Sequence, residues 1–424
     1  MQENFSEEPV LAEGGRRVKR EKKREGVPLL AVCVIVAIAM LLTFLSTYIY
    51  MLTAVAEDTG GVPPEAYAKL SHISEVLSKE YLYDIDEETL ADNVLKGYMY
   101  GIGDLYSDYF TADEFAALMS DTNAEMQGIG VSVVASSEYP GILITQVFPE
   151  SPARKAGVRP GDLITHVMSE GEMQSVTSLG YTIALTCLQG EAGTKAEFIV
   201  ARGEGFTEAC EFSIERGYIT EYTVSYRVYS KDSTVGVIAI TSFDKETPNQ
   251  FKAAYDELVA GGCKKLVVDV RNNPGGELIS VCTTLDMLVP EGPVIRTVDK
   301  AGNEEVVYTS DSNETTVPMA VLTNGNTASA GELFAACLRD YEKAILVGET
   351  TFGKGSMQTT KSFADGTAFK YTYRYYCPPF SDNYDGVGLT PDVKSSLSEE
   401  AMAKFYTLTD DEDTQLQAAV EALK

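Results

Sequence analysis

An uncharged apolar run near the N-terminus limits most strongly how this chain can fold. Residues 28–50 read PLLAVCVIVAIAMLLTFLSTYIY, and no charged side chain interrupts them. A helix of about 20 apolar residues crosses the ~30 Å hydrocarbon core of a bilayer. A buried soluble helix is the alternative, but the length of the run and its complete lack of charge argue against it. We therefore predict a transmembrane helix over residues 28–52.

The charges that precede this run predict its orientation. Seven of the 34 lysines and arginines fall in residues 16–24, RRVKREKKR. Basic flanks stay in the cytoplasm, so residues 1–27 are predicted to form a cytoplasmic basic tail. The expected protein is a single-pass cell-membrane protein with its main part extracytoplasmic. A cleaved signal peptide is the alternative, because Ala54-Val55-Ala56 is a small-x-small site, but the apolar run is longer than signal peptides usually have.

Composition excludes several classes of function. The 424 residues have a net charge of −29, whereas binding to nucleic acid requires clustered cations, so no nucleic-acid partner is expected. One of the seven cysteines, Cys33, lies in the apolar run, and the other six show no compact spacing. We interpret them as buried thiols rather than disulfides. Without a CxxC pair or a Cys/His cluster, no metal and no other cofactor is expected.

The remainder of the chain divides by its hydrophobic pattern. Apolar residues recur at helical spacing over residues 65–120, which predicts a helical N-terminal segment. Short β-rich runs broken by glycine and proline over residues 121–205 predict a small barrel or sandwich. Strands alternate with helices over residues 210–395, which predicts a largely parallel sheet covered by helices. Residues 396–424 are predicted to form an acidic helical tail, and the fold class is mixed α/β.

The β-rich segment resembles a PDZ domain. Its sequence contains SPARKAGVRPGDLITHV, and residues 127–131 read QGIGV, where a PDZ domain has its carboxylate-binding loop. Backbone N–H groups of such a loop bind a C-terminal carboxylate while the peptide adds as a strand to the sheet edge. The expected peptide-binding residues are Gly128, Ile129, Gly130 and Val131. Proteins with exposed apolar C-termini are the expected partners, although the two glycines taken alone could simply form a bend.

A candidate nucleophile lies in the α/β segment. Residues 321–338 run from an apolar strand through the loop TNGNTA to Ser329 and then directly into a helix. Such a turn places a side chain at the carboxyl edge of the sheet, near the positive end of the helix dipole. An ordinary helix N-cap is the alternative interpretation of Ser329.

Lys354 is the candidate base for this serine. It lies in TFGKGS at the end of the next apolar strand, and two adjacent strand ends would bring it beside Ser329. A lysine acts as a base only when burial lowers its pKa. The only histidines, His72 and His166, lie outside the α/β segment, which excludes a Ser-His-Asp triad built from that segment alone.

Together these motifs resemble those of the C-terminal processing (tail-specific) peptidases. The similar runs are VVDVRNNPGG, GNTASAGELFAACLRD, VGETTFGKGSMQT, DGTAFKYTYRYYCPP and GVGLTPD, and the similarity covers about residues 65–393. The resemblance implies a crotonase-like α/β core with Ser329 as nucleophile and Lys354 as base. It further implies that Gln358 holds the lysine by a hydrogen bond. For the oxyanion hole it implies the N–H groups of Ala330 and of a glycine in NNPGG, preferably Gly276.

The sequence departs from the common family pattern at two positions. Gly331 stands where serine or glutamate is usual, and Asn326 replaces a commoner glycine or serine. Neither residue belongs to the Ser-Lys-Gln set. We expect both changes to alter the flexibility of the loop before the helix.

The expected function is that of a serine endopeptidase that binds C-terminal tails and cleaves them without a cofactor. The resemblance also suggests two further properties. One is that the PDZ domain gates the active site, and the other is that a homodimer forms through the N- and C-terminal helical segments. Two alternatives belong to other classes. One is an inactive PDZ scaffold, and the other is acyl-CoA chemistry on a crotonase-type core, because a fold alone does not decide function.

Overall fold

The computed structural model describes residues 29–57, 63–121, 126–136 and 139–424. The predicted cytoplasmic tail lies outside the described residues. The chain separates into two units, residues 1–87 and residues 88–424, which are described one at a time.

The first unit contains two helices, α1 (Leu29–Glu57) and α2 (Pro64–Glu80). Helix α1 coincides with most of the predicted transmembrane segment, and the large apolar side chains that the structure describes on it are exposed. They include Val32, Val34, Val36, Ile38, Met40, Leu41, Leu42, Phe44 and Leu45. Within the part of the chain that the structure describes, no helix is both long enough and apolar enough to cross a membrane.

The second unit begins with a helical segment that contributes one strand to a distant sheet. Its elements are α3 (Glu87–Gly101), β1 (Asp108–Phe110) and α4 (Ala112–Asp121). Strand β1 pairs antiparallel with β18 (Ala368–Cys377), with Tyr109 opposite Phe369. The segment predicted to be helical therefore also contributes a strand to a sheet formed by residues that follow the PDZ-like domain.

A PDZ-like domain follows, as the β-rich pattern predicted. Its sheet has the order β3-β4-β5-β7-β8, with β6 paired to β5, and every pair in it is antiparallel. The strands are β3 (Val131–Ala135), β4 (Ile142–Val147), β5 (Leu163–Ser169), β6 (Glu172–Ser175), β7 (Lys195–Arg202) and β8 (Glu208–Glu215). The helices are α5 (Pro152–Ala156), α6 (Val176–Leu179), α7 (Tyr181–Leu188) and the 3-10 turn η1 (Glu204–Phe206). Alternate strand residues such as Ile142, Ile144, Phe198 and Val200 fill its core. The short strands β2 (Gln127–Gly128) and β9 (Gly217–Tyr218) pair where the domain begins and ends.

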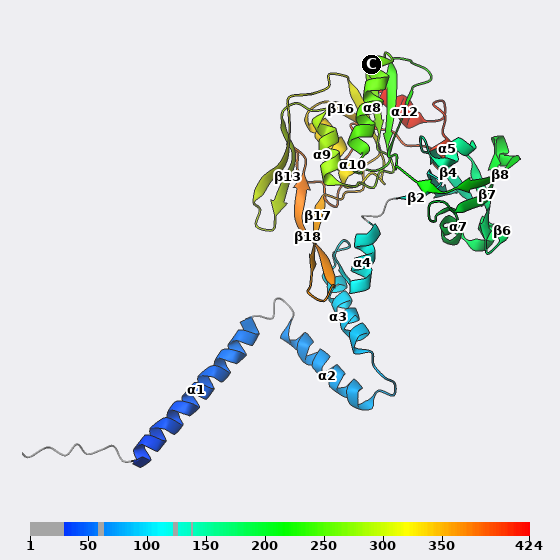
Figure 1. Ribbon diagram of the computed structural model, residues 1–424. Coiled ribbons are helices and arrows are strands. Elements are labelled where there is room, and N and C mark those ends of the chain that lie inside the picture. The colour runs from blue at the N-terminus through cyan, green and yellow to red at the C-terminus, as the bar shows by residue number, and fades with distance from the viewer. Residues whose placement is uncertain (1–28, 58–62, 122–125, 137–138) are drawn as a thin grey trace, which may run out of the picture. The chain divides into compact units, whose positions relative to one another are not determined.

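The α/β core is built on a six-stranded sheet with helices on both faces (Figure 1). In sheet order the strands are β10 (Val224–Val228), β11 (Val235–Ile240), β12 (Lys265–Asp269), β15 (Met319–Thr323), β16 (Ala344–Gly348) and β19 (Val393–Lys394). All neighbours are parallel except the antiparallel edge strand β10, which confirms the largely parallel sheet. The helices are α8 (Thr247–Ala260), α9 (Leu278–Asp286), α10 (Ala330–Asp340), α11 (Glu399–Ala403), α12 (Thr414–Ala422) and the 3-10 turn η2 (Phe405–Thr407).

Alternation along the strands decides which helix covers which face. Ile238 and Ile240 point to the face covered by α8, α9 and α10. Val237, between them in sequence, packs with Leu416 and Ala419 of α12 on the other face. The acidic tail was expected only to be helical, and its last helix completes the core.

A second, antiparallel sheet was not predicted. It contains β13 (Gly292–Asp299), β14 (Glu304–Ser310), β17 (Ser356–Ser362), β18 and β1. Strand β17 begins two residues after Lys354, so this sheet supports the loop that carries the candidate base.

Candidate active site

Ser329 lies on a strained turn between β15 and α10. Its backbone has φ 53° and ψ −118°, a region that non-glycine residues rarely occupy. A strained strand-to-helix turn of this kind presents the nucleophile in other hydrolases. Ser329 is the N-cap residue of α10, but an ordinary N-cap has an extended conformation and needs no such strain.

The glycine loop before α9 lies directly against this serine. A β-carbon on Gly275 would lie 2.7 Å from Ser329 Cβ, 3.1 Å from Ser329 Oγ and 3.1 Å from Ala330 N. A β-carbon on Gly276 would collide with the Phe243 carbonyl, and φ is positive at both glycines. Only glycine therefore allows this close approach.

Two backbone donors in this region are free. The Gly275 N–H donates to Asn273 Oδ1 at 2.8 Å. Among the hydrogen bonds of the described residues, neither Gly276 N–H nor Ala330 N–H has a partner. The first N–H groups of a helix lack intrahelical acceptors. Ala330 and Gly276 thus have the unpaired N–H groups that an oxyanion hole requires.

Lys354 lies half-buried in the loop between β16 and β17. Burial lowers its pKa, Lys370 lowers it further, and Asp104 and Asp385 act in the opposite direction. The Nζ atom lies 4.5 Å from the centroid of the Tyr106 ring. Among the described residues, no hydrogen bond joins Nζ to Ser329. The direction of the pKa shift is the one that a lysine base needs.

Glu332 connects the two candidate residues, and the sequence analysis missed it. Its buried carboxylate accepts hydrogen bonds from Ser329 N at 3.0 Å and Lys354 N at 2.8 Å, both on Oε2. The other oxygen accepts from Thr351 Oγ1 at 2.5 Å and Gly353 N at 2.7 Å. Burial raises the pKa of Glu332, and these hydrogen bonds oppose the rise. The S-x-x-E pattern of a capping box, starting at Ser329, was the signal that could have identified it.

Tyr376 is a second residue that the sequence did not reveal. Its hydroxyl donates to the Lys354 carbonyl and also interacts with the Ser329 side chain. Burial raises the pKa of this tyrosine, so it stays protonated and acts as a donor. Its place on β18 depends on the second sheet, which no local pattern in the sequence indicates.

Gln358, the residue that the resemblance places on Lys354, has no hydrogen bond to that lysine among the described residues. Its Nε2 donates to Thr372 Oγ1 at 3.1 Å and lies 3.4 Å from Ser356 Oγ. Gln358 is opposite Thr372 in the β17–β18 pair, next to a bulge at Met357. The bulge and this pairing direct the amide along the sheet.

The expected peptide-binding loop lies at the start of the PDZ domain. Ile129 is buried in the domain core, so only its backbone is available to a ligand. The carbonyls of Ile129 and Gly130 accept from Ala153 N at 2.9 Å and Phe148 N at 3.0 Å. Gly128 belongs to β2, and Val131 begins β3 opposite Val147. The loop is therefore fixed from both sides by the domain.

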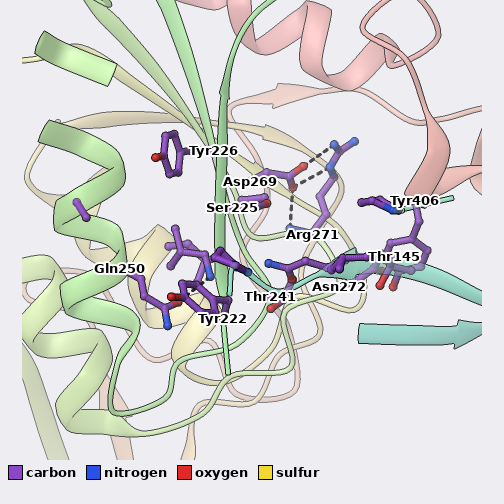
Figure 2. Close-up of a pocket in the computed structure, with 18 of the residues that line it drawn as sticks. Thr145, Tyr222, Ser225, Tyr226, Thr241, Gln250, Asp269, Arg271, Asn272 and Tyr406 are labelled. Carbon is purple, nitrogen blue, oxygen red and sulfur yellow. Dashed lines mark hydrogen bonds and ion pairs between the residues drawn. The ribbon is translucent and has the colours of Figure 1, made fainter. Parts of the chain in front are cut away.

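A cavity of about 860 Å³ lies between the PDZ domain and the core, and Figure 2 shows its lining. Thr145 of β4 contributes one wall, and Tyr222, Ser225 and Thr241 contribute to the other. Ser329 and Lys354 do not line it, but Asn272 at the start of the glycine loop does.

A buried arginine cluster holds the base of the glycine loop beside this cavity. Arg271 binds Asp269 at 2.6 Å (Figure 2). It also binds Asp413 at 2.7 Å, and its guanidinium lies 4.8 Å from the Phe405 ring centroid. Burial lowers the pKa of Arg271, but the two carboxylates outweigh it and raise the pKa overall. Since Asp413 is the N-cap of α12, the last helix is connected to the loop that carries Gly276.

The cysteines are free thiols wherever the structure describes them, and four of the six are buried. No group of three or more metal-binding side chains occurs in the described ranges.

These features define a PDZ-containing serine peptidase. A model of peptidase family S41 matches residues 234–395, and a PDZ-domain model matches residues 143–202. The carboxy-terminal processing protease CtpA of Bacillus subtilis is 31% identical over 391 residues, which are 92% of this chain and 80% of that protein. A CtpA-like serine protease of Staphylococcus saprophyticus is 31% identical over 353 residues, 81% of this chain and 70% of the relative. The chain belongs to peptidase family S41.

The fold is also found among solved structures. An S41 protease of Bacteroides fragilis is 17% identical, with a TM-score of 0.52, over 82% of this chain and 96% of that one. The predictions of a C-terminal processing peptidase and of a PDZ domain are confirmed.

Proposed function

We propose that this peptidase is a membrane-anchored, extracytoplasmic endopeptidase that binds protein C-terminal tails through its PDZ domain and cleaves them with Ser329 and Lys354. The observation that carries the assignment of the two residues is the single Glu332 oxygen that accepts both of their backbone N–H groups. A shared acceptor keeps the serine turn and the lysine loop adjacent, although they come from separate parts of the sequence.

The proposed reaction uses Ser329, Lys354 and two backbone donors. Lys354, as a neutral amine, takes the Ser329 proton while Oγ attacks the scissile carbonyl. The N–H groups of Ala330 and Gly276 stabilise the oxyanion, a contribution worth roughly 10²-fold or more in rate for each donor. Lys354 then gives its proton to the leaving amine. It next activates the water that releases the acyl group from Ser329.

The lysine must approach the serine for this to occur. In the described arrangement its Nζ lies over Tyr106, and the Gln358 amide donates to Thr372. The role that the resemblance implies for Gln358, a hydrogen bond to Lys354, would require its amide to leave Thr372. Gating by the PDZ domain would act on this approach and would appear as peptide-stimulated cleavage of a generic substrate.

The membrane anchor and the location are proposed from residues 28–50 and the basic residues before them. The exposed apolar side chains of α1 support the same proposal. Carbonate extraction should leave the full chain in the membrane fraction, and external protease should digest everything beyond residue 57. A chain recovered in the soluble fraction would contradict the anchor.

The exposed apolar side chains of α2 support the proposal of a homodimer. They are Tyr67, Leu70, Ile73 and Val76. Sedimentation of the detergent-solubilised chain should give twice the monomer mass, and Leu70→Glu should reduce it to the monomer mass. A monomer at every concentration would contradict this arrangement.

The catalytic proposal is tested on the full chain in detergent. The substrate is a disordered protein with an apolar C-terminus, compared with the same protein ending in charged residues. Ser329→Ala and Lys354→Ala should each reduce cleavage by roughly 10³-fold or more, whereas Lys361→Ala on the exposed part of β17 should not. Equal cleavage of both tails would reject PDZ selection, and an active Lys354→Ala enzyme would reject the base.

A further inference from the structure

Tyr106 lies under the side chain of Lys354. The Nζ atom is 4.5 Å from the centre of the tyrosine ring, inside the ~6 Å range in which a cation is attracted to a ring face. The tyrosine belongs to the segment between α3 and β1, before the PDZ domain in sequence. In sequence, the PDZ domain therefore separates Tyr106 from Ser329 and Lys354, although Tyr106 contacts Lys354 in the fold.

The segment around Tyr106 is held firmly by the second sheet. Thr372 N donates to the hydroxyl of the buried Ser107 at 3.2 Å. Asp104 accepts from Tyr106 N at 3.1 Å and also from the Ser107 hydroxyl. Tyr109 then pairs with Phe369 in the β1–β18 ladder. The backbone that follows Tyr106 is thus anchored to β18 at Ser107 and Tyr109.

The same strand connects this segment to Gln358. Thr372 accepts from the Gln358 amide through its side chain and donates to Ser107 through its backbone. Tyr106 and Gln358 are consequently held by the same strand, β18.

The contact uses the ring rather than the hydroxyl. Within the described part of the chain, no hydrogen bond to the Tyr106 hydroxyl is found, and only its backbone N–H is bonded. Phenylalanine would therefore keep the contact, whereas an aliphatic residue would remove it.

Several other charged or titratable groups surround Lys354, and they come from different elements. They are Lys370 on β18, Asp104 beside Tyr106, Asp385 in the loop after β18, Glu332 on α10 and Tyr376 on β18. The carboxylates of Asp104 and Asp385 favour the ammonium form, and Lys370 opposes it. Glu332 and Tyr376 bind the backbone of Lys354.

We infer that Tyr106 is a positioning residue for the reaction, whose ring face receives and orients the Lys354 ammonium ion formed when the serine proton is transferred. The inference rests on the proposed roles of Ser329 and Lys354. The proton passes from Ser329 Oγ to the Nζ lone pair and later to the leaving amine, and the ring forms no bond. The ring binds the ammonium ion more strongly than the neutral amine, so it stabilises the state after proton transfer.

The test is the pH dependence of kcat/KM for the full chain, with kcat and KM measured separately. Tyr106→Leu should lower kcat about 10-fold and leave KM within about 2-fold. The ring favours the charged lysine, so its removal lowers the pKa of Lys354 and moves the acidic limb of the profile to lower pH. Tyr106→Phe should keep both kcat and the limb of the wild type. Tyr100→Leu, at a highly exposed tyrosine of α3, is the matched control.

A second measurement separates electrostatics from packing. Phenylalanine with one, two or three fluorine atoms at position 106 keeps the ring but progressively weakens its negative face. A stepwise fall in kcat supports the inference, whereas equal activity across the series overturns it. The inference is also overturned if Tyr106→Leu keeps the wild-type kcat and the acidic limb of its pH profile does not shift. Activity in Lys354→Ala would instead reject the proposed base, so the two failures are distinguishable.

Discussion

The Glu332 carboxylate accepts the backbone N–H of Lys354 at 2.8 Å, although the two residues are 22 positions apart in sequence. The same oxygen accepts the N–H of Ser329. One buried side chain therefore controls the separation of the proposed nucleophile and base.

Replacing this carboxylate by an amide should disable the site. In Glu332→Gln, one orientation of the amide places its NH₂ group against the N–H groups of Ser329 and Lys354. The other orientation places it against the Gly353 N–H and the Thr351 hydroxyl. We expect kcat/KM to fall about 10²-fold, because a misplacement of about 1 Å can cost that much. We also expect a loss of about 2 kcal/mol in the free energy of unfolding. Kinetics and urea denaturation measure both, with the exposed Glu291→Gln as control. Wild-type kinetics in Glu332→Gln would disprove this role.

The lowered pKa of Lys354 predicts a pH dependence of both activity and stability. Activity requires the neutral amine, so kcat/KM should rise with pH through a limb below 10.5, the ordinary value for lysine. The folded state binds this proton less tightly than the unfolded chain, so the group destabilises the fold at neutral and low pH. Lys354→Met should therefore be inactive yet more stable at pH 7, with a gain that shrinks as the pH rises from the lowered pKa of Lys354 towards 10.5. An unchanged stability difference between pH 7 and pH 11 would contradict the assignment.

The Arg271 cluster should matter far more than an exposed ion pair. Arg271→Met leaves the carboxylates of Asp269 and Asp413 buried without their cation, which should cost about 3–5 kcal/mol. Arg374→Met removes an ion pair whose glutamate partner is 62% exposed and should cost less than about 1 kcal/mol. Denaturant unfolding gives both values, and hydrogen exchange should show faster opening of residues 272–277 only in Arg271→Met. Equal losses in the two variants would mean that the cluster has no special role.

Alanine substitutions at Gly276 and Gly302 distinguish the effect of backbone strain on stability from the effect of losing the oxyanion site on activity. Both have positive φ, but a β-carbon would strike the Phe243 carbonyl at Gly276 and meet nothing within 4 Å at Gly302. Gly276→Ala should lower kcat about 10²-fold or more, whereas Gly302→Ala should cost about 1 kcal/mol in stability and leave kcat unchanged. A fully active Gly276→Ala enzyme would remove this loop from the mechanism.

Local patterns in the sequence predicted the parts of the fold that depend on neighbouring residues. Strand alternation and helical spacing identified the PDZ sheet, the parallel core and the turn that carries Ser329. The second sheet was missed because its pairings join distant segments, as when Tyr109 meets Phe369. The contact of Tyr106 with Lys354 depends on that pairing and was missed for the same reason.

Inside the site, geometry that depends on a single local irregularity could not be predicted. The β-bulge between Met357 and Gln358 is an example, because no residue type in that strand indicates it. Glu332, by contrast, was readable from its spacing to Ser329 and was overlooked because a capping box is usually only structural.

The pairing of β2 with β9 joins the entrance and exit of the PDZ domain, with Gln127 opposite Tyr218. Strands β1 and β10, which flank it in sequence, already belong to sheets of the peptidase. The PDZ domain is thus an insertion into a chain whose catalytic part is complete around it. A recognition domain whose two ends lie side by side can be exchanged without changing the rest of the chain. Another PDZ domain placed between residues 126 and 219 would therefore direct the protease to different C-terminal tails.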